Sequence, residues 1–392
     1  LKKKLNFMNK NINFMENENA FKVLSRAQEL EEKGEKIINL GIGQPDLNPP
    51  KYVIEEAINS LKKENHGYSN AKGIFKLRET ISNEYQSLYN QQIDPNNIII
   101  SPGAKPIIYM AISMLSECNC EILLSNPSFP IYSSVINYCG AKPVYFDLKE
   151  ENNFDFIADD IIEKITDKTK LVILNSPCNP TGSVIKTNEL KKLLNFIENL
   201  PYKVFILSDE IYSKIIFNPN IPTSVLQYSK NLENLIIING LSKSFSMTGW
   251  RIGWGIFPNC LINNAEKYAV NIFSCVNNFT QFAAISALLK GLDFTENLKN
   301  IFSSRVSLMI KGINQINGFQ CKHPSGSFYC FVNIKNTNLS SSEVQDILLE
   351  QLGIATIDGN NFGSNNIYLR ISCCTSKENI KIALEKIGNY FN

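Results

Sequence analysis

A lysine and an arginine with complementary chemistry occur in one short segment, Gly240-Leu-Ser-Lys-Ser-Phe-Ser-Met-Thr-Gly-Trp-Arg-Ile-Gly253. Lys243 comes just after an apolar run, so we expect its amine at the end of a strand, where it can form an imine with an aldehyde. Arg251 offers a planar guanidinium that binds a phosphate dianion through two parallel hydrogen bonds. The pair favours a site for a phosphorylated aldehyde cofactor, although two cations on a solvated turn would show the same spacing.

Further polar motifs follow other apolar runs. The segment Ser101-Pro-Gly-Ala-Lys-Pro106 lies between an expected strand and an apolar helix. Free backbone N–H groups at a helix start bind phosphate, and Gly103 allows the chain to approach closely. Asn175-Ser-Pro-Cys-Asn-Pro-Thr-Gly182 and Ser208-Asp-Glu-Ile-Tyr212 close two more runs. Taken singly, the first of these is a Pro/Gly turn, and the aspartate of the second is a helix N-cap.

These motifs need a sheet that brings strand ends together. Short, nearly continuous apolar runs alternate with helical patterns along the chain; the runs are Ile98–Ile100, Ile122–Leu124, Val144–Phe146, Leu171–Leu174, Val204–Leu207, Leu235–Ile238 and Ile252–Ile256. Such runs separated by helices are typical of a largely parallel sheet with helices on both faces. Ligands of these sheets bind at the carboxyl ends of the strands. The sequence therefore predicts an α/β fold with the polar motifs gathered at one edge.

The two ends of the chain show different patterns. Apolar positions between Ala20 and Lys33 fall on one helical face, and a short strand is expected at Ile37–Leu40. The last helix is expected to begin with a capping box, Thr375-x-x-Glu378, followed by an apolar stripe from Ile380 to Phe391.

The change of pattern near residue 290 predicts two domains. We expect a large domain over residues 51–290 and a smaller α+β domain formed by residues 20–50 together with 291–392. Residues 1–19 show no clear periodicity and are expected to form a loose arm.

The composition excludes several classes of function. A formal net charge of +2, from 39 basic and 37 acidic residues, gives no electrostatic basis for a nucleic-acid or membrane partner. With only 2 histidines we expect no metal site. The 10 cysteines are scattered, without zinc or redox spacing, which indicates reduced thiols in a cytoplasmic protein. The sequence has no run of eighteen or more apolar residues, and its first residues lack a continuous apolar stretch, so we expect neither a transmembrane span nor a signal peptide.

In this order the motifs resemble those of class I aminotransferases, the fold-type I pyridoxal-phosphate enzymes to which aspartate aminotransferase belongs. The resemblance extends over about residues 20–390. It implies the two-domain architecture of that fold type, with pyridoxal 5'-phosphate held by Lys243 as a Schiff base. It also implies an amino acid and a 2-oxo acid as substrates, and a homodimer.

The resemblance assigns cofactor contacts to individual residues. Asp209 would pair with the pyridinium nitrogen, while Asn179 and Tyr212 would reach the phenolic O3′. A buried carboxylate suits this role, because it keeps the ring nitrogen protonated and the ring an electron sink. Phe129 matches the aromatic residue that stacks on the pyridine, although a single Phe is by default part of the core. The remaining cofactor contacts fall on Gly103, Ala104, Lys105, Ser242 and Arg251.

Four residues are assigned to the substrate or to the second subunit. Asn179, which would also reach the cofactor, is one of those that contact the substrate. Arg370, in Tyr368-Leu-Arg-Ile-Ser372, would clamp the substrate α-carboxylate through a bidentate pair. Gly43 lies where a glycine of the family borders the substrate. Tyr68 matches a tyrosine that reaches the phosphate of the neighbouring subunit, and a tyrosine on a surface turn is the competing interpretation.

One departure from the family pattern concerns the phosphate site. Many relatives have a phosphate-binding serine three positions before the lysine, where this chain has Gly240, and Ser242 is its expected substitute. Two other segments of familial appearance, Pro324-x-Gly-x-Phe-Tyr-x-Phe331 and Gly359-x-x-Phe-Gly363, are interpreted as structural.

The expected reaction is a transamination in which Lys243 is the general base for the substrate Cα–H. Three alternatives remain open on the sequence: a lyase or decarboxylase with the same cofactor, a non-catalytic binding protein with the same fold, and a nucleotide-binding oxidoreductase. The sequence has no G-x-G-x-x-G motif after the first strand of the sheet, so we rank the oxidoreductase last. Lys105 resembles a lysine that helps to hold the distal carboxylate of acidic substrates, so aspartate or glutamate is the favoured donor and 2-oxoglutarate the expected acceptor.

Overall fold

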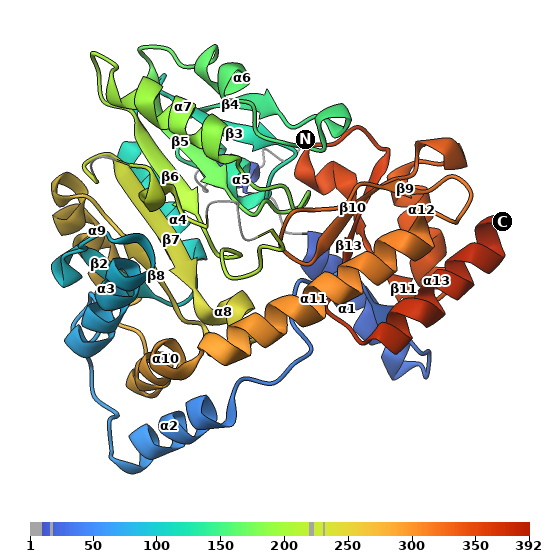
Figure 1. Ribbon diagram of the computed structural model, residues 1–392, viewed down its shortest axis with the longest axis horizontal. Coiled ribbons are helices and arrows are strands. Elements are labelled where there is room, and N and C mark those ends of the chain that lie inside the picture. The colour runs from blue at the N-terminus through green and yellow to red at the C-terminus, as the bar shows by residue number, and fades with distance from the viewer. Residues whose placement is uncertain (1–9, 16–18, 219–222, 230–231) are drawn as a thin grey trace, which may run out of the picture.

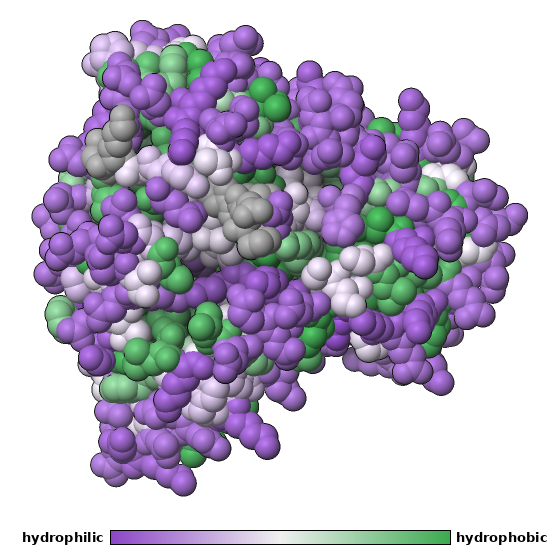
Figure 2. All heavy atoms as spheres, viewed as in Figure 1, coloured by the Kyte–Doolittle hydropathy of each residue, from purple (hydrophilic) through white to green (hydrophobic). Residues whose placement is uncertain are grey.

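The computed structural model describes residues 10–15, 19–218, 223–229 and 232–392. A larger lobe built on a central sheet lies beside a smaller lobe that contains the C-terminus (Figure 1). The long helix α11 (Leu292–Ile313) runs from one lobe to the other. On the face drawn in Figure 2, hydrophilic side chains predominate and apolar ones form separate patches. Within the described ranges no helix is both long and apolar enough to cross a membrane.

The larger lobe is organised around a seven-stranded sheet, as the apolar runs predict. Its strands follow the order β2-β8-β7-β6-β5-β3-β4. In that order they are Ile98–Ser101, Gly253–Ile256, Leu235–Gly240, Phe205–Asp209, Thr169–Asn175, Glu121–Asn126 and Lys142–Asp147. Strand β8 is antiparallel to β2 and β7, and the other pairs are parallel. Each predicted run overlaps one strand.

Helices cover both faces of this sheet. Alternate residues of each strand enter different apolar clusters, so that Ile99 and Ile100 of β2 lie on opposite faces. One face is covered by α3 (Phe75–Tyr89), α7 (Thr187–Glu198) and α10 (Asn278–Lys290), and α2 (Lys51–Lys62) packs on α10. The other face is covered by α4 (Lys105–Leu115), α5 (Ile131–Tyr138) and α9 (Asn259–Ile272).

The smaller lobe contains a four-stranded antiparallel sheet in the order β12-β13-β10-β9. These strands are Ile357–Asp358, Tyr368–Ser372, Tyr329–Asn333 and Gln320–Cys321, and they pack with α11, α12 (Ser341–Asp346) and α13 (Lys377–Phe391). The short strand β1 (Ile38–Asn39) pairs with β11 (Ile354–Ala355), which places this N-terminal segment on the small lobe. One apolar cluster joins Leu40 to residues between Val306 and Ile387. We therefore retain domain limits of 20–50 with 291–392, and 51–290, as a proposal.

The two chain ends differ in detail from expectation. Helix α1 spans Asn19–Glu32, close to the predicted limits. The predicted capping box on Thr375 is wrong by one residue, because the Ser376 side chain accepts the hydrogen bond from the Asn379 backbone N–H and caps α13. In the predicted arm, residues 10–14 form a 3-10 turn against α5, where Asn11 Nδ2 donates to the Tyr138 carbonyl at 3.0 Å. Residues 1–9 and 16–18 of that arm lie outside the described ranges.

Candidate active site

A cavity of about 430 Å³ lies between the lobes, at the carboxyl ends of β5 and β6 and just beyond β7. Most of the residues that the sequence analysis selected line it: Gly43, Ala104, Lys105, Phe129, Asn179, Asp209, Tyr212, Ser242, Lys243, Arg251 and Arg370. Gly103 lies against Arg251 at its edge. Tyr68 does not line the cavity, and its side chain is 91% exposed.

Asp209 ends β6 at the base of the cavity and is buried. The Tyr132 hydroxyl donates to its Oδ2 at 2.8 Å, and the Ile211 N–H donates to its Oδ1 at 3.2 Å. Burial raises the pKa of Asp209 from 3.8 to about 6, against the opposing effect of these two donors and of the charge on Lys243. A carboxylate in this position is suited to a cationic or N–H partner inside the cavity.

Two asparagines connect the Asp209 backbone to the opposite wall. Asn175, at the end of β5, donates from Nδ2 to the Asp209 carbonyl at 3.1 Å, and its Oδ1 accepts the Asn179 N–H at 2.8 Å. The Asn179 Oδ1 in turn accepts from Arg370 Nη1 at 3.0 Å. Tyr212, after β6, lies with its hydroxyl 3.2 Å from that of Tyr329. Side chains from both lobes are thus fixed around one space.

Lys243 lies in the single turn α8 (Leu241–Ser244), which follows β7 directly. Its Nζ donates to the Gly43 carbonyl at 2.6 Å, so the amine is held at the cavity wall. Glycine is required at position 43 because a Cβ there would lie 1.8 Å from the Tyr329 hydroxyl. The turn that contains Gly43 therefore lets the backbone approach both Lys243 and the small lobe.

The opposite end of the cavity is suited to an anion. Gly103 has φ +85°, and a Cβ on it would lie 2.4 Å from Arg251 Nη2. Arg251 donates to the Thr248 carbonyl at 2.7 Å and to the Pro102 carbonyl at 3.3 Å, which holds the guanidinium beside the turn before α4. The first backbone N–H groups of α4 and this guanidinium lie at the same end, and both favour a phosphate.

Arg370 is buried in strand β13 at the small-lobe side of the cavity. Its guanidinium carbon lies 4.4 Å from the Tyr329 ring centroid and 4.8 Å from that of Phe362, and Nη2 donates to the Gly41 carbonyl at 2.7 Å. Its Nε is buried without a hydrogen-bond partner. A buried donor of this kind is costly unless a ligand completes it, and a carboxylate would do so.

Aromatic rings flank the remaining cation. Lys105 Nζ lies 5.6 Å from the ring centroids of both Phe21, on α1, and Phe129, and all three residues line the cavity. Phe21 is partly exposed, so this part of the wall faces the opening.

Several lining residues escaped the sequence analysis. Tyr132 and Phe21 were not selected, and Tyr329 lies in a segment that was interpreted as structural only. That interpretation is incomplete for Phe362 as well, because its ring covers Arg370. Tyr132 lies in the first turn of α5, three residues after Phe129, and this closeness in sequence to a selected residue was an available signal.

The structure explains the glycine that replaces the expected serine. A Cβ on Gly240 would lie 2.9 Å from both the Gly253 Cα and the Ile252 carbonyl oxygen, so β7 and β8 leave no room for a side chain. Ser242 is buried and lines the cavity.

These observations can be tested against the cofactor that the fold implies. The Gly103 turn with Arg251 offers an anion site, buried Asp209 offers an acceptor for a ring N–H, and the Lys243 amine lies on the wall between the lobes. The unpartnered Arg370 Nε adds a carboxylate site. The residues present therefore fit a phosphorylated pyridine aldehyde.

The fold and this site together define a pyridoxal-phosphate transferase of the aspartate aminotransferase type. Residues 35–387 match the family described as Aminotransferase class I and II, and the chain belongs to that family. It is accordingly a pyridoxal-5'-phosphate-dependent aminotransferase. The alternative interpretation as a nucleotide-binding oxidoreductase is therefore wrong.

Individual relatives are similar over nearly their whole length. The chain is 37% identical over 373 residues to the (5-formylfuran-3-yl)methyl phosphate transaminase of Methanocaldococcus jannaschii, covering 94% of this chain and 95% of that protein. It is 34% identical over 369 residues to an aspartate aminotransferase of Pyrococcus horikoshii, covering 93% of each. The structure of aspartate aminotransferase from Thermus thermophilus with maleate superposes with a TM-score of 0.91 at 25% identity, over 97% of this chain and 99% of that one.

Proposed function

We propose that this aminotransferase moves an amino group between an L-amino acid with a distal carboxylate, aspartate or glutamate, and a 2-oxo acid such as 2-oxoglutarate. The observation that supports this most directly is the pair of cations on the cavity wall. Arg370 offers an unpartnered Nε for the α-carboxylate, and Lys105 lies near the opening between Phe21 and Phe129. Two carboxylates on one small molecule suit two such cations.

The cofactor would be held by the residues that surround the cavity. Bound pyridoxal phosphate supplies an aldehyde and an electron-withdrawing ring. Lys243 would hold the aldehyde carbon, Asp209 the ring N–H, and Asn179 with Tyr212 the phenolic oxygen. Phe129 would lie against the ring. The phosphate end would be bound by Gly103, Ala104, Ser242 and Arg251, with Tyr68 from the second subunit. Lys105, the next residue after this turn, would lie beside the cofactor with its amine toward the substrate.

The protein side chains then divide the work of the reaction. Arg370 and Gly43 would fix the substrate so that its Cα–H faces Lys243. The substrate amine would first replace Lys243 on the aldehyde carbon, and the freed lysine amine would then take the Cα proton as general base and later return it. Asp209 keeps a ring proton in place by remaining anionic beside it. Burial of the wall around these groups excludes water, which strengthens each charged contact.

A homodimer is part of the same proposal. Tyr68 does not line the cavity of its own subunit, although the resemblance assigns it to a phosphate site. Apolar side chains on the outer face of α2 are exposed, namely Ile54, Ile58 and Leu61. A second copy would cover such a face and give Tyr68 a partner.

The substrate proposal is tested by assaying amino donors against 2-oxoglutarate with the purified, cofactor-loaded enzyme. Aspartate should give the highest kcat/KM. Lys105→Gln should lower kcat/KM for aspartate by about 10- to 100-fold, the cost of losing one charge-assisted contact, and should change that for alanine much less. Lys76→Gln, an exposed lysine on α3, is the matched control. An equal loss with both donors would contradict the distal-carboxylate assignment.

The reaction class is tested by a single turnover without an acceptor. A transaminase should release one equivalent of 2-oxo acid per site and retain the nitrogen, and Lys243→Ala should abolish the release. Ammonia or carbon dioxide instead would indicate a lyase or decarboxylase, and full turnover by Lys243→Ala would indicate that the site is not catalytic.

A second acceptor deserves inclusion in the same assay because of the relative from M. jannaschii. That protein is named for an aldehyde phosphate, and its identity to this chain is 37%. A phosphate would suit the same cation, Lys105, as a distal carboxylate does. A preference for a furan aldehyde phosphate over 2-oxoglutarate would favour this second function.

A further inference from the structure

The loop of residues 66–73, which carries Tyr68, combines an exposed side chain with a firmly held backbone. The Tyr68 side chain is 91% exposed. The loop around it is nevertheless bonded to three elements: Ile100 of β2 donates its N–H to the Lys72 carbonyl at 2.9 Å, Asn278 of α10 donates to the Gly67 carbonyl at 2.8 Å, and Arg78 of α3 donates to the Gly73 carbonyl at 3.1 Å. These three hydrogen bonds hold the loop backbone against the large lobe, although the tyrosine that it carries is exposed.

Gln281 of α10 is fully buried and provides a first set of further hydrogen bonds to the loop. Its Oε1 accepts the Ile74 N–H at 2.8 Å, while Nε2 donates to Ser69 Oγ at 3.1 Å and to the Val276 carbonyl at 2.7 Å. One buried amide thus ties both sides of the loop to a helix. Removing it would leave the partly buried Ile74 N–H and the buried Val276 carbonyl without these partners.

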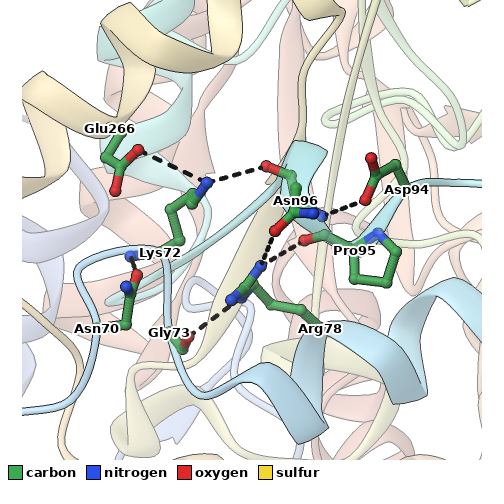
Figure 3. Close-up of polar contacts among 8 residues, drawn as sticks. All are labelled: Asn70, Lys72, Gly73, Arg78, Asp94, Pro95, Asn96 and Glu266. Atoms are coloured by element: carbon green, nitrogen blue, oxygen red, sulfur yellow. Dashed lines mark hydrogen bonds and ion pairs between the residues drawn. The ribbon is translucent and has the colours of Figure 1, made fainter.

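Arg78 provides a second set of hydrogen bonds, and Figure 3 shows its side chain directed at the end of the loop and at the segment before β2. Its Nη1 donates to the Pro95 carbonyl at 2.7 Å and to Asn96 Oδ1 at 3.4 Å, in addition to the bond from Nε to Gly73. Arg78 is 5% exposed, and none of the ion pairs among the described residues involves it. A buried cation is therefore used to position three neutral oxygens.

Gly73 brings the loop close to β2. It has φ +95°, and a Cβ there would lie 2.3 Å from Ile100 Cγ1 and 2.9 Å from Gln281 Oε1. Lys72 adds a peripheral contact, with Nζ 3.6 Å from Glu266 and 3.4 Å from the Asn96 carbonyl (Figure 3). The loop position is thus set by the same strand that leads into the Gly103 turn.

We propose that Gln281 and Arg78 are positioning residues that hold Tyr68 in place for the cofactor phosphate of the partner subunit. The inference rests on the proposed dimer and deepens it, since it assigns the effect of these two residues to the other subunit's site. A loop backbone that is held before association loses little conformational freedom on binding, which is the physical benefit of these hydrogen bonds.

Hybrid dimers can separate an effect on the same subunit from an effect on its partner. A Lys243→Ala subunit has no working site of its own, so a hybrid with a Lys243 subunit has one working site, which receives Tyr68 from the Lys243→Ala chain. Gln281→Leu is placed either in the Lys243→Ala chain or in the Lys243 chain. Each hybrid is isolated with two different affinity tags.

The measured quantity is the dissociation constant of pyridoxal phosphate at the working site, followed by the absorbance of the bound cofactor. With Gln281→Leu in the Lys243→Ala chain, binding should weaken about tenfold, as for loss of one charged hydrogen bond. With the substitution in the Lys243 chain, binding should stay within about twofold of wild type. Equal effects in the two arrangements, or a larger effect within the Lys243 chain, would overturn the inference.

Arg78→Lys is the milder second variant, because it keeps the charge and loses the planar guanidinium that reaches three oxygens. It should show the same asymmetry between the two arrangements. Lys76→Ala, on the same helix, is the control without effect in either. A monomeric wild-type enzyme that still transaminates would overturn the inference and leave the substrate proposal intact. A hybrid in which cofactor binding shows the expected asymmetry but which has no transaminase activity would support the inference and contradict the proposed function.

Discussion

Asp209 has the most strongly conflicting requirements of any single residue in the site. It must be anionic to hold a ring N–H, yet it is buried, and burial raises its pKa to about 6. Tyr132 offsets part of this cost by donating to Oδ2 at 2.8 Å. Before the cofactor binds, the folded protein therefore contains a charge that it stabilises poorly.

The first prediction concerns the stability of the apoprotein against pH. The pKa of Asp209 is about 6 when folded and 3.8 ordinarily, so between these values the folded state binds the proton more tightly than the unfolded chain. Stability should therefore fall as the pH rises through this window, by about 3 kcal/mol. Asp209→Asn should remove that fall in denaturant titrations from pH 4 to 8. Glu210, whose pKa burial raises to about 7, should keep most of its own contribution, because the neighbouring Asp209 charge raises that pKa much less than burial does. Identical pH slopes in wild type and Asp209→Asn would contradict this.

A second prediction follows for Tyr132. Its donated hydrogen bond lowers the pKa of Asp209, so Tyr132→Phe should raise that pKa further and move the upper end of the stability fall upward by about one pH unit. The same titration of the apoprotein measures the shift. Tyr138→Phe, on the same helix α5 but outside the cavity, should leave the pH profile as in wild type. A profile unchanged by Tyr132→Phe would show that the hydroxyl does not tune the carboxylate.

Single residues were predictable from sequence where a short motif contains both the residue and its setting. Lys243 and Arg251 belong to one segment, and Arg370 belongs to another. Tyr132 was missed because its partner, Asp209, lies 77 positions away and meets it only through the sheet. Tyr329 was missed because its hydroxyl reaches Tyr212 from the other lobe. No local pattern encodes such contacts.

At the scale of elements, the contact between β7 and β8 determines which residue the chain tolerates at position 240. Gly240 and Gly253 are directly opposite in this antiparallel pair. A Cβ on Gly240 would lie 2.9 Å from the Gly253 Cα, which is backbone and has little freedom to move. Close packing of the two strands therefore leaves no room for a serine side chain at this position.

The third prediction tests this packing. Gly240→Ser, which introduces the serine that the family resemblance led us to expect, should destabilise the protein by about 1–3 kcal/mol, because the added atoms force the strands apart. Urea unfolding of the purified variant gives the value. Gly249→Ser is the control for stability alone, since no atom lies within 4 Å of a Cβ at Gly249. A Gly240→Ser protein as stable as the control would show that the strands can separate without cost.

The strands themselves were predictable, whereas the direction of one of them was not. Buried strands covered on both faces need apolar residues at every position, and the seven runs supply this signal. Strand β8 runs in the opposite direction because the segment between Gly240 and Gly253 turns the chain back. This segment contains α8 and Arg251, which has a left-handed conformation at φ +53°. The same segment contains Lys243 and Arg251. Its residues were interpreted as a cofactor site, and this interpretation did not predict the direction of the strand that follows.

At the scale of the whole molecule, the cavity exists only where the two lobes meet, so their relative position matters for binding. Glu150, which follows β4 in the large lobe, accepts Asn333 Nδ2 at 2.6 Å and the Tyr368 hydroxyl at 2.8 Å, both from the small lobe. Phe154 lies edge-on to Phe331 and Tyr368, with ring centroids 5.6 and 5.8 Å apart. These contacts join the lobes beside a second hollow, away from the cavity that Lys243 lines.

The last prediction is that Glu150→Ala weakens this junction. Two donors lose a shared acceptor, so the free energy of unfolding should fall by about 1–3 kcal/mol. Tyr368 lies on the same strand as Arg370, so KM for the amino donor should also rise while the dissociation constant of pyridoxal phosphate stays constant, because most of the proposed cofactor contacts belong to the large lobe. Glu151→Ala, at an exposed neighbouring position, is the matched control. If both variants matched wild type in urea unfolding and in donor KM, the lobes would be held together by packing alone, and the Glu150 hydrogen bonds would contribute nothing to substrate binding.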